Sequence, residues 1–185
     1  MAEVQGCELP EDLYYDIEKD TWVKPLGDNI VMLGMTDVAQ TQAGKILHVT
    51  FKKVGSIVQK RGNTATIESG KWVGPIPSPV SGEIIEVNEA LLKDPLLLNL
   101  SPYTDAWVSK VKASDINELK TLLTGKEAST TYSITNLSSG DRNCIDYVNK
   151  TDMFAQCSLF VFGKQVKEDF YQSIMIYIKP ILDIR

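Results

Sequence analysis

Glycine recurs at short intervals in the first half of this sequence, and this spacing limits the length of any strand or helix between the turns. The glycines concerned are Gly27, Gly44, Gly55, Gly62, Gly70 and Gly82. Because glycine has no Cβ, it adopts the backbone conformations of tight turns more readily than other residues do. Short segments rich in β-branched residues lie between these glycines, a pattern typical of an all-β sandwich or barrel.

Individual segments give a first set of elements. The predicted strands are Asn29–Gly34, Lys45–Phe51, Thr64–Glu68 and Glu83–Asn88. One helix is expected over Thr36–Ala43, with Thr36 as its N-cap. A second is expected over Ser114–Leu123, where Ser114 caps the helix and acidic residues occupy its first turn.

The composition changes along the chain of 185 residues, of which 43% are hydrophobic. The whole net charge of −5 falls within residues 1–125, and Ser129–Asn143 is rich in serine and threonine, which favours turns and loops. We therefore predict a domain over residues 1–125, a connector over residues 126–144 and a small, packed α/β extension over residues 145–185. The extension is rich in aromatic residues and holds a predicted strand at Ser158–Phe162, whereas Lys167–Tyr177 fits either a helix or a strand.

Charge and cysteine content exclude several classes of protein. A net charge of −5 leaves no basic surplus to neutralise phosphates, so nucleic-acid binding is not expected. No apolar run approaches the length that crosses a bilayer, and the acidic N-terminus lacks the pattern of a secretory leader. The three cysteines form no CxxC pair, which argues against a disulfide scaffold or a zinc site and favours a reducing cytoplasm.

The most informative stretch is Ala65–Gly82, which reads as a strand, a turn at Ser69-Gly70-Lys71 and a proline-stiffened return. Gly70 would allow a positive φ at the tip of this hairpin and expose Lys71 to solvent. An exposed lysine in a turn is by itself usually a solvated surface residue. The sequence around Lys71 therefore has to decide whether this one has a function.

Several motifs in the same order as in a known family surround this hairpin. They are Gly34-Met35-Thr36-Asp37-Val38-Ala39-Gln40, Val54-Gly55, Glu68-Ser69-Gly70-Lys71, Ser78-Pro79-Val80-Ser81-Gly82-Glu83, Val87-Asn88-Glu89-Ala90, Asp94-Pro95, Asn99, Ser101-Pro102-Tyr103 and Trp107. Residues 13–125 resemble the H protein family of the glycine cleavage system, in which Glu-Ser-Val-Lys stands where this chain has Glu68-Ser69-Gly70-Lys71.

This resemblance implies a mainly β, lipoyl-domain-like β-sandwich (a barrel-sandwich hybrid) with flanking helices. It also implies a lipoyl carrier with lipoic acid attached covalently to Lys71 and no catalytic centre of its own. Glu68, Ser69 and Gly70 would form the turn that a lipoate ligase or lipoyl transferase recognises, or Glu68 and Ser69 would only end a strand. The alternative from another class is an unmodified binding module.

The sequence departs from the family pattern at three places. Trp72 replaces a small residue after the lysine, and Asp20-Thr21 stands where the family has a histidine before the early tryptophan. The extension is additional, and the single histidine, His48, is expected to be a structural residue inside an apolar strand. The Trp72 side chain would either contact a partner or fold back onto the sheet.

The motif at Gly6-Cys7, together with Glu68 to Gly74, resembles a subgroup of H-like lipoate-binding proteins found with heterodisulfide-reductase-like complexes in sulfur oxidation. This resemblance favours sulfur as the cargo and that complex as the partner. The alternative is a glycine cleavage H protein that carries an aminomethyl group between glycine decarboxylase, aminomethyltransferase and dihydrolipoamide dehydrogenase. In the sulfur role, Cys7, Cys144 and Cys157 would exchange with the lipoyl disulfide or serve as small buried side chains.

Overall fold

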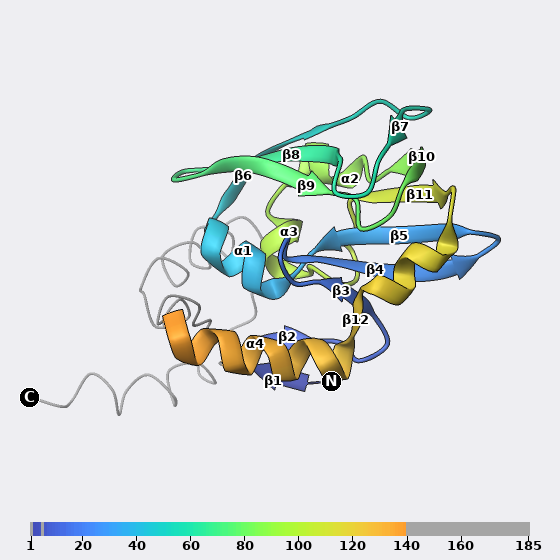
Figure 1. The fold of residues 1–185 in the computed structure, drawn as a ribbon. Coiled ribbons are helices and arrows are strands. Elements are labelled where there is room, and N and C mark those ends of the chain that lie inside the picture. The colour runs from blue at the N-terminus through green and yellow to red at the C-terminus, as the bar shows by residue number, and fades with distance from the viewer. Residues whose placement is uncertain (1, 5, 140–185) are drawn as a thin grey trace, which may run out of the picture. The chain divides into compact units, whose positions relative to one another are not determined.

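The computed structural model describes residues 2–4 and 6–139, which lie in the unit Met1–Tyr147 of the chain. Two antiparallel sheets stack on each other, and short helices and an N-terminal hairpin flank them (Figure 1). This is the mainly β architecture with flanking helices that the sequence predicts. The predicted extension over residues 145–185 lies outside the described residues, as do Ser158–Phe162 and Lys167–Tyr177.

The larger sheet has seven strands in the order β12-β3-β4-β5-β11-β10-β7. In chain order these are β3 (Tyr14–Asp16), β4 (Thr21–Gly27), β5 (Ile30–Met35), β7 (Ile57–Val58), β10 (Gly82–Val87), β11 (Ser109–Ala113) and β12 (Leu123–Thr124). The turn between β4 and β5 runs through Gly27, Asp28 and Asn29, all at positive φ. Glycine, aspartate and asparagine are the residues that tolerate this conformation best.

The smaller sheet has three strands in the order β6-β8-β9. They are β6 (Ile46–Phe51), β8 (Asn63–Ser69) and β9 (Val73–Pro77). The four predicted strands correspond to β5, β6, β8 and β10 and are confirmed to within two residues at each end.

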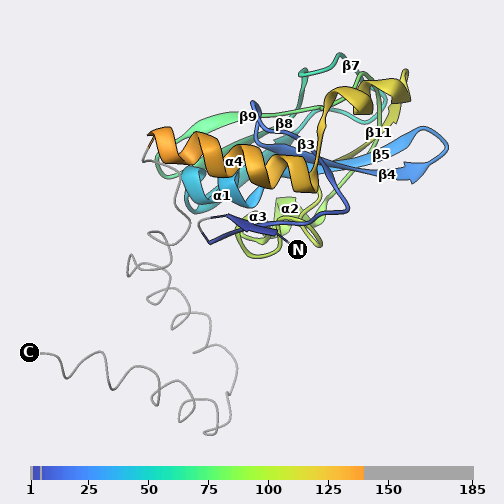
Figure 2. The same cartoon turned by 60° about the horizontal axis from the view of Figure 1, so that its bottom comes forward.

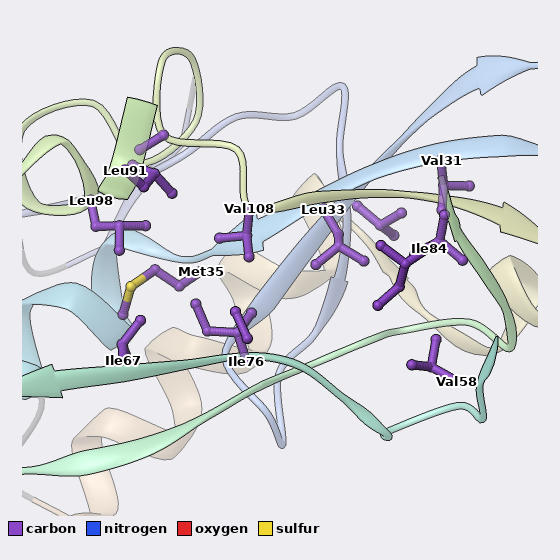
Figure 3. Close-up of a cluster of buried hydrophobic side chains, with 14 of the residues drawn as sticks. Val31, Leu33, Met35, Val58, Ile67, Ile76, Ile84, Leu91, Leu98 and Val108 are labelled. Carbon is purple, nitrogen blue, oxygen red and sulfur yellow. The ribbon is translucent and has the colours of Figure 1, made fainter. Parts of the chain in front are cut away.

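The core lies between the inner faces of the two sheets (Figure 3). Ile67 and Ile76 of the smaller sheet face Leu33 and Met35 of the larger sheet and Val108, the residue just before β11. All five side chains are buried. Alternate residues of each strand point inward, so every strand supplies only part of its length to the core. This packing fixes the smaller sheet, including the β8–β9 hairpin, against the larger one.

The remaining elements cover the edges of the two sheets. They are β1 (Ala2–Val4), β2 (Cys7–Leu9), α1 (Asp37–Ala43), α2 (Ala90–Lys93), α3 (Leu97–Leu100) and α4 (Gly125–Ser139). The predicted N-cap of α1 is confirmed, because the Thr36 hydroxyl accepts a hydrogen bond from the Ala39 backbone N–H at 3.1 Å. Figures 1 and 2 both show α4 beside the β1–β2 hairpin.

Some polar residues in the family motifs tie distant segments together. Asn99 accepts from the backbone N–H of Ile46 and donates to the carbonyl of Gly44, both at 2.9 Å, so it connects α3 to the start of β6. The hydroxyl of Tyr103 donates to the carbonyl of Glu8 and accepts from the N–H of Asp37. These motif residues therefore hold the fold in place around α1.

The predicted helix over Ser114–Leu123 is only partly correct. The structure has a 3₁₀ helix over Ile116–Thr121, and Asp115, not Ser114, caps it by accepting from the N–H of Asn117. The helix ends early because Leu123 and Thr124 form β12 and pair with β3. Leu123, which the local sequence pattern places at the end of the helix, therefore pairs with a neighbouring strand instead.

The expectation that residues 126–144 form a connector rich in loops is wrong for residues 126–139, which belong to α4. Thr124 and Glu127 form a capping box, in which the Glu127 carboxylate accepts from the N–H and the hydroxyl of Thr124. Hydroxyl groups along α4 donate back to carbonyls three or four residues earlier, so they are satisfied within a helix. Residues 126–139 lie in the same unit, Met1–Tyr147, as residues 1–125.

Candidate functional site

Lys71 lies at the tip of the β8–β9 hairpin and is exposed, as the sequence predicts. Ser69 organises this tip. Its backbone N–H donates to the carbonyl of Trp72 at 2.8 Å, and its hydroxyl accepts from the N–H groups of Lys71 at 3.3 Å and Trp72 at 3.1 Å. Ser69 therefore shapes the turn, because its hydroxyl binds the backbone N–H of the lysine and the backbone N–H of the residue after it.

The prediction of a positive φ at Gly70 is wrong. The glycines at positive φ among the described residues are Gly6, Gly27, Gly44 and Gly55. A Cβ built on Gly70 would meet no atom within 4 Å. The turn closes through Ser69, so the tip does not depend on a glycine.

Glu68 and His48 are neighbours across the smaller sheet. In the strand register, Glu68 of β8 lies opposite His48 of β6 on one side and Val73 of β9 on the other. All three are exposed. The expectation that His48 is buried inside an apolar strand is wrong, because the register shift at Ile46/His48 turns its side chain to the outer face.

A cavity of about 560 Å³, which we call the hairpin pocket, lies directly beside Lys71. Its wall comes from the β3–β4 turn, α1 and the inner face of the β8–β9 hairpin. The lining residues are Glu18, Lys19, Asp20, Thr21, Met35, Ala39, Gln42, Ala43, Ile67, Lys71, Trp72, Pro75, Ile76 and Pro77. The hairpin and α1 contribute mainly apolar side chains, whereas the charged residues other than Lys71 lie on the β3–β4 turn.

Three contacts hold the charged side of the pocket. Arg61 binds the buried carboxylate of Asp16 at 3.1 Å and the exposed carboxylate of Glu18 at 2.7 Å. The hydrogen bond to Asp16 is the main reason that the pKa of Arg61 is raised. On the other side, the hydroxyl of Tyr132 donates to the Asp20 carboxylate at 2.8 Å. The acidic residues beside Lys71 are therefore held in place by residues remote in sequence.

Thr21 adds a polar group to this wall. Its side chain is only 2% exposed, and within the described part of the chain its hydroxyl has no hydrogen-bond partner. A buried hydroxyl without a partner is energetically unfavourable, so a bound group that pairs with it would be favoured there. In the sequence, the only signal for this residue is that Asp20-Thr21 departs from the family pattern.

Trp72 folds back over the hairpin yet stays partly exposed. A Cβ on Gly74 would lie 1.9 Å from Cζ2 of the indole, so the ring occupies the space above that glycine. The side chain keeps 44% of its surface exposed and lines the hairpin pocket. A single conformation of Trp72 thus allows both expected roles: the ring folds back onto the sheet, and its exposed surface can still contact a partner.

Cys7, the cysteine within the described residues, does not line the hairpin pocket. Cys7 is fully buried in the cluster between the β1–β2 hairpin and α4, and it is disulfide-bonded. Cys7 therefore carries no free thiol in this structure, and its complete burial fits the alternative of a small buried side chain. Cys144 and Cys157 lie outside the described residues.

Within residues 2–4 and 6–139, no group of three or more His, Cys, Asp or Glu side chains is arranged to hold a metal ion. In the same part of the chain, no helix has the length and apolar character required to cross a membrane.

The site fits a long acyl group attached to Lys71. The lysine is exposed at a rigid tip, and the adjacent pocket combines an apolar floor with one unpaired buried hydroxyl. The chain of a lipoyl group is apolar apart from its amide, which matches this lining. The β-sandwich and its hairpin lysine thus define the class of lipoyl-type carrier domains.

Comparisons with known proteins define the family. Residues 13–134 match the family described as "Glycine cleavage H-protein". The chain is 52% identical over 118 residues to "Glycine cleavage system H protein 3" of Aquifex aeolicus, which covers 64% of this chain and 73% of the relative. It is 50% identical over 125 residues to "Probable glycine cleavage system H protein 2" of Sulfolobus acidocaldarius, covering 66% and 84%.

A solved structure agrees with these sequence matches. The crystal structure of a glycine cleavage system H protein from Mycobacterium marinum superposes with a TM-score of 0.59 and 30% identity, over 66% of this chain and 98% of that one. The chain belongs to the glycine cleavage H-protein family. Proteins of this family are lipoyl carriers that act with partner enzymes.

Proposed function

We propose that this protein is a lipoyl carrier whose lipoic acid is attached to Nζ of Lys71. The observation that carries the proposal is the exposed lysine on a serine-ordered hairpin tip beside an apolar pocket, in a chain of the H-protein family. A bound lipoyl group would supply a dithiol–disulfide couple that carries a group covalently between enzymes. The protein itself supplies reach, position and recognition.

Attachment would form one amide bond. The neutral amine of Lys71 would attack the activated carboxyl carbon of a lipoyl adenylate or thioester that the ligase or transferase supplies. The adenylate or thiol group would leave, and the lysine nitrogen would lose a proton. Exposure of Lys71 allows this approach, and Ser69 orders the backbone of the turn that carries the lysine.

Glu68, Ser69 and Gly70 form the turn that we assign to recognition by the ligase or transferase. Glu68 is exposed on the outer face of β8, one residue before the turn, so an enzyme that binds the tip can reach its carboxylate. Ser69 acts by shaping the turn. Gly70 leaves open space where an enzyme could approach the backbone closely.

The best supported cargo is the aminomethyl group of glycine, because the family and the relatives named above are glycine cleavage H proteins. The partners would then be glycine decarboxylase, aminomethyltransferase and dihydrolipoamide dehydrogenase. Sulfur carriage with a heterodisulfide-reductase-like complex is the second candidate, and none of the comparisons supports it. The observation in its favour is the large Trp72 side chain in the wall of the pocket, where the glycine cleavage pattern has a small residue.

The test is the intact mass of the protein purified from its native host, followed by peptide mapping around Lys71. We expect the mass of one lipoyl group on Lys71, and its loss in Lys71→Arg. A carbon–nitrogen fragment on the arm would support glycine cleavage, and additional sulfur atoms would support the second candidate. An unmodified Lys71 would contradict the proposal and leave an unmodified binding module as the better account.

Lys71→Ala separates these two classes functionally. A carrier would lose group transfer completely, because the attachment atom is gone. A binding module would keep its affinity for its partner. Val73→Ala is the matched control, since Val73 is exposed on the same hairpin and does not line the pocket.

A further inference from the structure

Trp72 and Gly74 form a stacked pair on the inner side of the β8–β9 hairpin. An ideal Cβ on Gly74 would lie 1.9 Å from Cζ2 and 2.2 Å from Cη2 of the Trp72 ring, so no other residue fits beneath the indole. Gly74 is not among the described glycines at positive φ. Glycine is therefore needed at position 74 to seat the indole, and not for its backbone freedom.

This seat determines where the rest of the indole lies. Trp72, Gly74 and Ile76 alternate along the chain, so they share one face of the hairpin. Of these three residues, Trp72 and Ile76 line the hairpin pocket, as do Pro75 and Pro77. One side of the ring thus rests on the backbone of β9, and the remaining surface forms a wall of the pocket next to Lys71.

The exposed surface of this ring is unfavourable in water. Trp72 keeps 44% of its surface exposed although the fold has brought it to the pocket. Covering apolar surface is favourable, and a sulfur atom makes additional favourable contact with an aromatic ring. A group that is apolar, carries sulfur and is attached to the neighbouring residue would meet both conditions.

We propose that Trp72 is a positioning residue for the modified lysine: its indole, seated on Gly74, is the wall against which the lipoyl chain of Lys71 lies in the hairpin pocket. This inference rests on the proposed attachment of lipoic acid to Lys71. The next residue, Val73, is 61% exposed and faces away from the pocket, so it has no part in this contact. A single aromatic contact is weak enough to be exchanged when a partner enzyme takes up the arm.

The experiment uses the full-length lipoylated protein and first confirms one lipoyl group on Lys71 by intact mass. Tryptophan emission is then compared in the unmodified, lipoylated and reduced lipoylated forms, because a cyclic disulfide in contact with an indole quenches its emission. Of the three tryptophans, Trp22 is fully buried and Trp107 lies near Lys110, and neither lines the pocket. We expect lipoylation to lower the emission, and we expect this change to disappear in Trp72→Phe.

A second readout follows the arm directly. The reduced arm is alkylated with a maleimide, and the rate is measured on the peptide that contains Lys71, which excludes the chain's own cysteines. Trp72→Ala removes the wall, and Gly74→Ala displaces the indole while keeping it in the sequence. We expect both variants to be alkylated about three to ten times faster than the wild type, the range that an ordinary aromatic contact gives. Val73→Ala should react at the wild-type rate.

The outcomes separate this inference from the proposed function. A lipoylated protein with the same alkylation rate in the wild type, Trp72→Ala and Gly74→Ala would overturn the role of Trp72 and leave the carrier function intact. Quenching that persists in Trp72→Phe would overturn it as well. A Lys71 without a lipoyl group would overturn both.

Discussion

The hydroxyl of Tyr132, on α4, donates a hydrogen bond of 2.8 Å to the carboxylate of Asp20, which lines the hairpin pocket. Asp20 has a positive φ of 51°, and its carbonyl accepts from the N–H of Thr36 at the start of α1. Tyr132 is almost fully buried beside Ala128 in the cluster that α4 shares with the N-terminal hairpin. The helix after the β-sandwich therefore supports one wall of the site.

Tyr132→Phe tests the contribution of this bond. The substitution keeps the aromatic ring in its cluster and removes the hydroxyl, so we expect the free energy of unfolding to fall by about 1.5–3 kcal/mol, as for a hydrogen bond to a charged group. Urea denaturation followed by circular dichroism measures this. Ser133→Ala, on an exposed position of the same helix, should change the free energy by less than about 0.5 kcal/mol. Equal effects of the two substitutions would contradict a special role for Tyr132.

Trp22 and Gly34 face each other across β4 and β5. A Cβ on Gly34 would lie 2.6 Å from Cζ2 of Trp22, whose side chain is completely buried and donates to the carbonyl of Pro102 at 2.9 Å. We expect Gly34→Ala to lower the free energy of unfolding by about 2–3 kcal/mol, because the ring has no space to move into. Thermal and urea unfolding provide the measurement, and a change below about 1 kcal/mol would mean that the ring relocates easily.

Gly70 should respond in the opposite way. Its φ is outside the left-handed region and its Cβ position is empty, so alanine fits the native turn without strain. Gly70→Ala should raise the free energy of unfolding by about 0.4–1 kcal/mol, because alanine reduces the entropy of the unfolded chain. A clear loss of stability in the same urea titration would show that the turn needs a positive φ here after all. Lipoylation of this variant, read by intact mass, tests separately whether the ligase needs the space at position 70.

The sequence predicted those strands whose apolar residues alternate between glycines, namely β5, β6, β8 and β10. It missed β9, because this strand contains Pro75 and Pro77 and proline is normally excluded from sheets. The structure explains the exception: β9 is an edge strand of the smaller sheet, where one side needs no backbone donors. β7 and β12, of two residues each, are too short to leave a periodic pattern.

The candidate site was predictable at its tip and not in its pocket. The segment around Lys71 is continuous in the sequence, so both the exposed lysine and the role of Ser69 in a turn follow from local chemistry. The pocket joins the β3–β4 turn, α1 and the hairpin, whose proximity arises only from sheet packing. α4 was missed because the serines and threonines of residues 129–139 suggested a loop, although Thr124 and Glu127 carry the spacing of a capping box.

That capping box predicts how the stability of α4 depends on pH. The backbone N–H of Thr124 donates to the Glu127 carboxylate at 2.9 Å, and its hydroxyl donates at 2.8 Å. These two bonds, the backbone bond first, lower the pKa of Glu127 below its ordinary value of 4.5. Because the folded pKa is the lower one, the stabilisation is present above pH 4.5 and is lost as the pH falls through the folded pKa.

Hydrogen exchange of the first-turn amides of α4 provides the measurement, taken at a series of pH values with the intrinsic exchange rate removed. We expect Glu127→Gln to reduce protection at neutral pH, and we expect the difference from the wild type to shrink as the pH falls from 4.5 through the lower folded pKa of Glu127, below which both side chains are uncharged. Glu83→Gln, at an exposed position of β10, is the control and should leave the α4 amides unchanged. If the difference between the wild type and Glu127→Gln stayed constant across the whole pH range, the effect would come from lost side-chain shape and not from the charge of the cap.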